Sequence, residues 1–412
     1  MVAQSSSFKT IEEHRIYYKD SIENNITYGT YEPTDLIGLD DNSLIISSSF
    51  SISFPGQYST PSEYSKEYLS IQKEMYSKSH TSSGSIIKLN KEFKKEWELI
   101  FKEKRVERIK MTTSGKIIAV GERTDMEKFW VSLISINGKI IWEKEFKNKK
   151  ESTITDIDLD SLDNLFVLLE SKRIIPVKTI KYPYQKRRLV LFQKSEENGI
   201  YLTKIDSTGK TKWTKRIFQK RNFDSYGSDI KLNHNKIFIS YSYEGYKRVN
   251  DSLAKDEAKI VTALNHSGKI IKNLKTTNNK LLFSKKDVIN VSGESNNENE
   301  LVIEKDFKTF KTLTIPDEIE HYWLKEGIKT NIGYYLFGTN DHNLGYLILG
   351  LDRDYGLINY WKSETSNGED ATAITIQSDG SIIVVGEKTD KNIKLPYGNA
   401  TYIDIIKLKN GV

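Results

Sequence analysis

The chain has no cysteine, and this absence excludes disulfides, thiolate metal sites and cysteine nucleophiles. Only 7 of its 412 residues are proline and no long Gly/Ser stretch occurs, so nothing marks an internal domain boundary. No run of about 18 apolar residues exists, so no transmembrane helix is expected. We therefore expect a single domain over residues 1–412.

Catalytic and metal-binding motifs are also missing. The 6 histidines are isolated and form no paired spacing of the HExxH kind, which argues against a zinc hydrolase. No nucleophile elbow, phosphate-binding loop or dinucleotide fingerprint occurs. Asp156, Asp158 and Asp160 alternate along one stretch, but Ser161 and Val167 stand where a calcium-binding EF-hand needs glycine and glutamate. The sequence therefore predicts no metal ligand set.

Charges of both signs are interspersed along the chain, with 62 basic and 56 acidic residues. The net charge of +6 describes a mixed solvated surface, and nucleic acid is not an expected partner. The hydrophobic fraction is 37%, and Tyr, Ser, Thr, Ile and Asn are abundant. This composition is typical of many short, half-exposed strands.

Two short patterns alternate along the sequence. The first is a turn followed by an apolar strand, and copies begin near residues 41, 114, 162, 234, 284, 331 and 379. The second is a strand, a polar turn and another strand, as in "FWVSLISINGKIIWEKEF" (129–146) and "IYLTKIDSTGKTKWTKRIF" (200–218). Each pair of patterns makes four antiparallel strands, whose two apolar faces are buried by stacking similar sheets around an axis. We predict an all-β, seven-bladed β-propeller of four-stranded antiparallel blades.

The two ends of the chain are predicted to meet in one blade. The last repeat stops after its third strand, and a segment at about residues 14–22 precedes the first repeat without a partner. We expect this N-terminal segment to complete the last blade as its outer strand, because such closure removes an unpaired sheet edge.

The turn segment "KIDSTGKTKW" (204–213) carries a family resemblance. It resembles the pyrroloquinoline-quinone-type repeat of the quinoprotein-like propeller superfamily, and the outer-membrane-assembly lipoprotein propellers in particular. That repeat has an Asp, a Thr-Gly-Lys turn and a Trp three residues after the Lys, which Trp142 and Trp213 match. We expect these Trp side chains to pack between blades. The quinone site is not matched, because cysteine is absent and seven repeats are counted, so no cofactor is expected.

Charged residues are expected to line the axial channel if the first strand of each blade is innermost. Asp156 and Asp229 occupy similar places in two such strands, and Arg108 lies in a third. The sequence leaves open whether water or a bound cation such as calcium offsets the repulsion between the carboxylates. A propeller hydrolase or lyase would use these three residues as its axial site.

Four insertions interrupt the connection between the second and third strands of a blade, at residues 51–83, 172–199, 244–258 and 391–400. Equivalent connections emerge on one face of a propeller, so we expect one elaborated face and one plain face. The first two insertions carry Tyr and Arg, the types that dominate protein-binding hot spots: Tyr58, Tyr64, Tyr68, Tyr182, Tyr184, Arg187 and Arg188.

These observations favour a non-catalytic scaffold that binds another protein through the elaborated face. The resemblance implies a partner in the cell envelope or in a secretion or assembly complex, with peripheral association with a membrane complex. A glycan-binding module that stacks sugars on the insertion tyrosines is the alternative reading. Ala3-Gln4 resembles the pair left around signal-peptidase cleavage in Bacteroidetes proteins, so we expect an exported protein, periplasmic or associated with the outer membrane.

Overall fold

The structure is a computed structural model, and its described residues are organised entirely as strands and turns. They are residues 8–17, 19–22, 25–28, 30–51, 82–123, 128–147, 151–172, 174–175, 195–221, 223–233, 236–249, 252–276, 280–283, 288–291, 300–305, 308–316, 319, 322–340, 345–363, 370–395 and 398–410. In this part of the chain no helix is long and apolar enough to cross a membrane.

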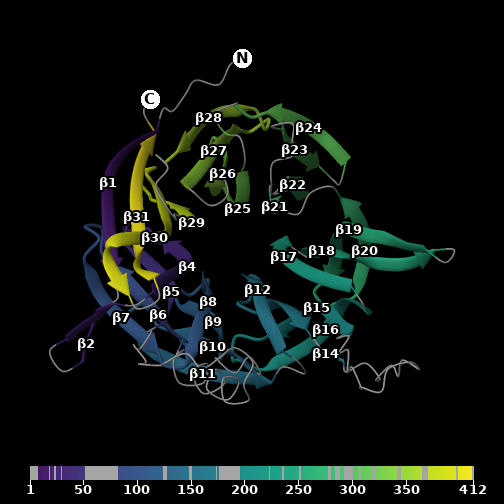
Figure 1. Cartoon of the computed structure of the whole chain (residues 1–412), viewed down its shortest axis with the longest axis horizontal. Coiled ribbons are helices and arrows are strands. Elements are labelled where there is room, and N and C mark those ends of the chain that lie inside the picture. Colours follow the sequence, from purple (N-terminus) through teal and green to yellow (C-terminus); the bar gives the residue numbers. More distant parts are fainter. Residues whose placement is uncertain are drawn as a thin grey trace, which may run out of the picture.

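Antiparallel sheets stand around a central axis, with the first strand of each sheet nearest the axis (Figure 1). Six of them have four strands. In chain order they are β4 (Thr30–Gly38), β5 (Leu44–Ser51), β6 (Ser82–Leu89) and β7 (Lys95–Phe101); β8 (Lys104–Met111), β9 (Ile117–Arg123), β10 (Lys128–Ile134) and β11 (Ile140–Lys147); β17 (Phe223–Asn233), β18 (Lys236–Val249), β19 (Ser252–Asn265) and β20 (Ile270–Thr276); β21 (Lys280–Phe283), β22 (Val288–Val291), β23 (Glu300–Lys305) and β24 (Lys308–Thr314); β25 (Tyr322–Lys329), β26 (Gly333–Asn340), β27 (Gly345–Asp352) and β28 (Leu357–Lys362); and β29 (Asp370–Ile376), β30 (Ile382–Leu395) and β31 (Gly398–Asn410) with β1 (Phe8–Tyr17). The fold is a β-propeller.

The expectation of seven four-stranded blades is wrong, because the described residues form six. The sheet between β11 and β17 has five strands: β12 (Glu151–Leu159), β13 (Leu165–Lys172), β14 (Ile174–Ile175), β15 (Ser195–Ile205) and β16 (Thr211–Arg221). The pairing of β15 with β13 stops at Gly199, and Ser195 and Glu196 pair with β14 instead. Strand β15 extends beyond the end of its pairing with β13, and β14 covers the edge of β15 that would otherwise be unpaired.

The last sheet is closed by the N-terminal part of the chain. Strand β1 pairs antiparallel with β31, with His14 opposite Ile405, so strands from both ends lie in one sheet (Figure 1). The closing strand comes earlier than the expected residues 14–22, because β1 ends at Tyr17 and the next segment, β2 (Lys19–Ile22), forms a hairpin with β3 (Asn25–Tyr28).

The middle strands are buried and the outer strands are more exposed, except that Asn359, Tyr360 and Trp361 of the outer strand β28 are also buried. Strands β9 and β27 are buried along nearly their whole length, whereas the outer strands β11 and β20 are mostly exposed. The apolar clusters join neighbouring sheets: Val120 of β9 and Ile157 of β12 belong to one of them. The first strands also pack against one another around the ring, and β29 returns to β4. The sheets therefore bury each other's faces.

The repeated polar turn has one geometry, seen clearly between β15 and β16. The N–H of Asp206 donates to the carbonyl of Lys210, and the N–H of Gly209 donates back to the carbonyl of Asp206. Gly209 has a φ of 77°, a conformation that glycine adopts without steric cost. A Cβ there would also lie 3.0 Å from the Trp142 ring of the preceding sheet. The Trp of one blade therefore packs under the turn glycine of the next, and the same pairing joins Trp97 to Gly138 and Trp213 to Gly268.

Two of the four expected insertions lie mostly in the described residues, and their described parts continue as paired strands. Residues 244–258 belong to the β18–β19 hairpin, which stays paired as far as Val249 and Ser252. Residues 391–400 belong to the β30–β31 hairpin, which resumes pairing after a bulge at Lys394 and Leu395. Strand alternation places both hairpin ends on one side of the ring, which we call the hairpin face. Most of 51–83 and of 172–199 lies outside the described residues.

Candidate axial site

Six first strands share a β-bulge at the same level along the axis. In each, one extra residue interrupts the pairing with the second strand, and these residues are Thr34, Glu107, Thr155, Ser228, Lys325 and Thr372. A bulge takes backbone groups out of the ladder and redirects the neighbouring side chains. The bulge level is therefore where polar groups must be supplied to satisfy the backbone.

Residues at the bulge level surround an axial cavity of ≈ 390 Å³. Its lining is mainly charged or hydroxylic: Asp35, Asp156, Asp229, Glu326 and Asp370; Arg108, Lys110, Lys231 and Lys325; Thr34, Ser228 and Thr372. The structure thus brings the predicted axial residues Asp156, Asp229 and Arg108 to one cavity. Sequence reasoning missed Asp35 and Glu326, although each stands directly after a bulge residue, as Asp156 and Asp229 do.

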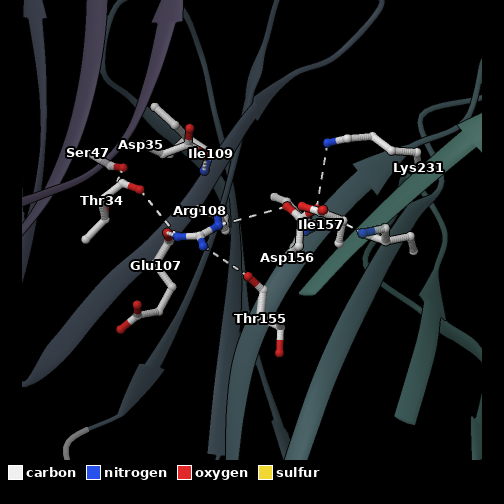
Figure 2. Close-up of polar contacts among 12 residues, drawn as sticks. Thr34, Asp35, Ser47, Glu107, Arg108, Ile109, Thr155, Asp156, Ile157 and Lys231 are labelled. Atoms are coloured by element: carbon white, nitrogen blue, oxygen red, sulfur yellow. Dashed lines mark hydrogen bonds and ion pairs between the residues drawn. The ribbon is translucent and has the colours of Figure 1, made fainter. Parts of the chain in front are cut away.

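Arg108 links three first strands at this level (Figure 2). Its Nη1 donates to the carbonyls of Glu107 (2.7 Å) and Thr34 (3.3 Å), and its Nη2 donates to the carbonyl of Thr155 (3.0 Å). All three acceptors are carbonyls of bulge residues, on β8, β4 and β12. The guanidinium therefore satisfies backbone oxygens at the bulges of its own strand and both neighbours.

Asp156 ties β12 to β17 with both carboxylate oxygens. Oδ1 accepts from the N–H of Ile157 (2.8 Å), and Oδ2 accepts from the N–H of Ile230 on the next first strand (3.0 Å). Asp35 repeats this arrangement between β4 and β8, where its Oδ1 and Oδ2 accept from Leu36 and Ile109. Neighbouring sheets share no backbone ladder, so each carboxylate supplies hydrogen bonds that join one first strand to the next.

Asp158 forms the same tie two residues beyond Asp156. Its Oδ1 accepts from the N–H of Leu159 (2.9 Å) and its Oδ2 from the N–H of Leu232 (2.7 Å). The third aspartate of the alternating series, Asp160, instead begins the turn after β12 and accepts from Leu162 and Asn164. The series therefore does not form one row along the channel.

The charges around Asp156 favour its ionised form. Burial disfavours the carboxylate, but Lys231, Lys110 and Arg108 together outweigh it and lower the pKa of Asp156. Burial acts to lower the pKa of Lys231, and the facing carboxylates of Asp156 and Asp229 raise it instead. The closest approaches to Asp156 are 3.8 Å from Lys231 Nζ and 3.9 Å from Arg108 Nε. Asp156 and Lys231 are therefore both charged at neutral pH.

Other lining residues come from the opposite part of the ring. Lys325 of β25 donates to Asp370 of β29, which joins these two first strands. Burial, with a contribution from Asp35, raises the pKa of Glu326, while Lys110 and Lys231 oppose the shift. Within the described ranges, no three His, Asp or Glu side chains are grouped as metal ligands. The cavity therefore offers mixed charge and hydroxyl groups.

The predicted partner-binding residues lie outside the described part of the chain. These are Tyr58, Tyr64 and Tyr68 of the first insertion, and Tyr182, Tyr184, Arg187 and Arg188 of the second.

No family model and no curated protein matches the sequence. Among solved structures, the chain is similar to the Dos1 propeller, with 9% identity, a TM-score of 0.49 and coverage of 98% of this chain and 95% of the other. It is also similar to the polysaccharide lyase Uly1, at 8% identity, TM-score 0.47 and coverage of 97% and 99%. The β-propeller domain of the Trilobed protease from Pyrococcus furiosus matches at 10% identity, TM-score 0.45 and coverage of 92% and 93%. At these values the propeller assignment depends on the strand pairing itself, and the quinoprotein-like resemblance stays a prediction.

Proposed function

We propose that this β-propeller is a non-catalytic scaffold that binds another protein through its hairpin face. The observation that carries the proposal is the pair of extended hairpins, β18–β19 and β30–β31, on that single face. The β18–β19 hairpin projects beyond the ring (Figure 1). Paired strands are preorganised, so a partner that binds them does not have to order a flexible loop.

The base of the β18–β19 hairpin is held by an aromatic cluster. The ring of Tyr243 stacks on Phe218 with centroids 4.9 Å apart and meets the edge of Phe223 at 5.8 Å. Lys220 lies over the Phe223 ring at 3.6 Å and pairs with Asp256 at 2.9 Å. These contacts join the hairpin to β16 and β17, so its position relative to the ring is fixed.

The axial geometry supports a binding role over a catalytic one. A general acid or base must present an oxygen within hydrogen-bond reach of the reacting group. In Asp156 both carboxylate oxygens already accept backbone N–H groups, and the guanidinium of Arg108 is occupied by carbonyls. Two of the three residues that an axial hydrolase or lyase would use, Asp156 and Arg108, are thus engaged in holding the first strands together.

The partner belongs to the same proposal. We propose a protein of the cell envelope or of a secretion or assembly complex, met by an exported propeller in the periplasm or at the outer membrane. Two resemblances support this partner and location. The turn of residues 206–213 resembles the repeat of the outer-membrane-assembly lipoprotein propellers, and Ala3-Gln4 resembles the pair left around signal-peptidase cleavage.

The test removes the end of the β18–β19 hairpin. Residues 246–255 are replaced by Asn-Gly, a pair that closes a two-residue hairpin after Gly245. Tagged wild-type and shortened proteins are crosslinked in the native host, purified and compared by quantitative mass spectrometry. The control is the double variant Lys139→Glu and Lys210→Glu, which changes exposed turns on the opposite face.

Loss of one stoichiometric partner from the shortened protein alone is the expected result. Circular dichroism and the melting temperature should show that its ring is intact. Equal recovery of that partner with the shortened protein would contradict docking on this hairpin. Recovery of no protein, together with oligosaccharide binding by the purified chain, would favour the glycan-binding alternative.

A further inference from the structure

Among the residues whose exposure is described, two large aromatic side chains on first strands are exposed. Trp323 of β25 is 55% exposed and Tyr226 of β17 is 42% exposed. By contrast, Trp130 and Trp361 are buried, with exposures of 0% and 8%. A large apolar side chain left in water at such a place is typical of a binding surface.

The two aromatic residues occupy equivalent positions. Trp323 precedes the bulge residue Lys325 by two residues, and Tyr226 precedes the bulge residue Ser228 by two. The residue at the same position on β29 is Asp370, which lines the axial cavity, while Trp323 and Tyr226 are not among the lining residues. Because β17 and β25 are innermost strands (Figure 1), the exposed Trp323 and Tyr226 rings lie beside the channel, next to the cavity and outside its lining.

The residues next to Trp323 support this orientation. Tyr322 and Leu324 are 0% and 3% exposed and belong to the apolar cluster shared with the preceding sheet, so Trp323 between them points the other way. Both β17 and β25 begin near these aromatics, and by strand alternation first strands begin at the hairpin face. Trp323 and Tyr226 thus stand at the mouth of the axial cavity, on the hairpin face.

The other strands supply polar side chains at this mouth level. The residues that precede the remaining bulges by two are Glu32, Arg105, Thr153 and Asp370, and all four are exposed or half-buried. Arg105 is paired with Glu32 at 3.7 Å, and Asp370 with Lys325. The mouth therefore combines two aromatic surfaces with donors and acceptors of both signs.

We propose that the axial mouth binds a β-linked oligosaccharide of pyranose units with equatorial hydroxyl groups. Such a ring presents C–H bonds on its face, which can stack on the Trp323 and Tyr226 rings, and hydroxyl groups around its edge. At the mouth, the carboxylates of Glu32 and Asp370 can accept from these hydroxyl groups, while Arg105 and the hydroxyl of Thr153 can donate to them.

The charge of the cavity favours this ligand class over an ionic one. Its carboxylates already face Arg108, Lys110 and Lys231, so the cavity has no excess of one charge that would attract a cation or an anion. A neutral ligand rich in hydroxyl groups can use both signs at once. The volume of ≈ 390 Å³ is in the range of small-molecule sites.

The test is isothermal titration calorimetry of the full chain with cellohexaose and with chitohexaose. The variants are Trp323→Ala, Trp323→Phe and, as matched control, Phe310→Ala, which removes a 53% exposed aromatic residue from the outer strand β24. We expect wild type and Phe310→Ala to bind at least one sugar with a Kd below about 1 mM. Trp323→Ala should bind about tenfold more weakly or not at all, and Trp323→Phe should recover part of the loss.

Two results would overturn the proposal. One is the absence of binding by wild type to both sugars at millimolar concentration. The other is equal affinity of wild type and Trp323→Ala, with circular dichroism showing both folded. The inference is independent of protein docking, because the protein shortened at residues 246–255 should keep its sugar affinity even if it loses its protein partner.

Discussion

Substitution of Asp156 by Asn should weaken the ring itself. The amide keeps one acceptor oxygen, so either Ile157 or Ile230 loses the acceptor of its backbone N–H and meets an NH₂ group instead. Leaving one buried N–H unsatisfied costs about 1–3 kcal/mol. Lys231 and Arg108 also lose part of their counter-charge, and we expect a total loss of about 2–4 kcal/mol.

The expected change in melting temperature follows from the size of the chain. Unfolding entropy of about 2.1 cal/mol/K per residue over 412 residues gives about 0.9 kcal/mol/K, so the loss lowers Tm by about 2–5 °C. Differential scanning calorimetry of wild type, Asp156→Asn and the exposed same-strand control Thr153→Ala measures it. A Tm of Asp156→Asn within 1 °C of the control would refute the inter-strand role of this carboxylate.

Three further predictions concern the turn, a buried carboxyl group and ring closure. In urea unfolding, Gly209→Ala should lower the free energy of unfolding by about 1 kcal/mol more than Gly115→Ala does. Both glycines have positive φ, but only Gly209 lies against Trp142, so equal losses would contradict the packing argument. Burial raises the pKa of Glu122 to about 7 from 4.5, so the folded state binds more protons than the unfolded state between these pH values, and Tm should fall as pH rises from 5 to 8. Glu122→Gln should flatten this dependence of Tm on pH, and an unchanged dependence would count against the raised pKa of Glu122. Deletion of residues 1–17 removes β1 and exposes the edge of β31, so light scattering should show aggregation of the truncated chain, and a stable monomer would argue that closure is dispensable.

Local patterns in the sequence predicted the repeated turn and the packing of its Trp, whereas the expectation of seven four-stranded blades was wrong. The polar turn and its Trp recur at fixed spacing, and the structure shows the Trp142 ring beneath the turn glycine Gly209. The N-terminal closing strand followed from a missing partner in the last repeat, but its bounds were misplaced because residues 19–22 pair with β3 instead. The fifth strand of one sheet, β14, has only two residues and no pattern long enough to detect.

The axial site was only partly predictable, because the directions of its side chains depend on β-bulges that the sequence pattern does not show. Asp156, Asp158 and Asp160 alternate in the sequence, but only Asp156 and Asp158 form the same tie to β17, because Asp160 begins the turn after β12. Alternation also gives no sign that Trp323 is exposed, since a Trp in a strand is usually buried between sheets. Exposure there depends on how far the neighbouring first strand stands from it, which is a property of the closed ring.

The two levels of the axial channel are under different physical constraints. At the bulge level, backbone groups leave the ladder, so Asp35, Arg108 and Asp156 are needed for the stability of the ring whatever the protein binds. Two residues nearer the hairpin face, the pairing with the second strand is regular, and side chains as different as Thr153 and Trp323 occupy equivalent positions. Residue identity at the mouth can therefore follow the ligand without loss of the fold, which is why we assign recognition to the mouth and stability to the bulges.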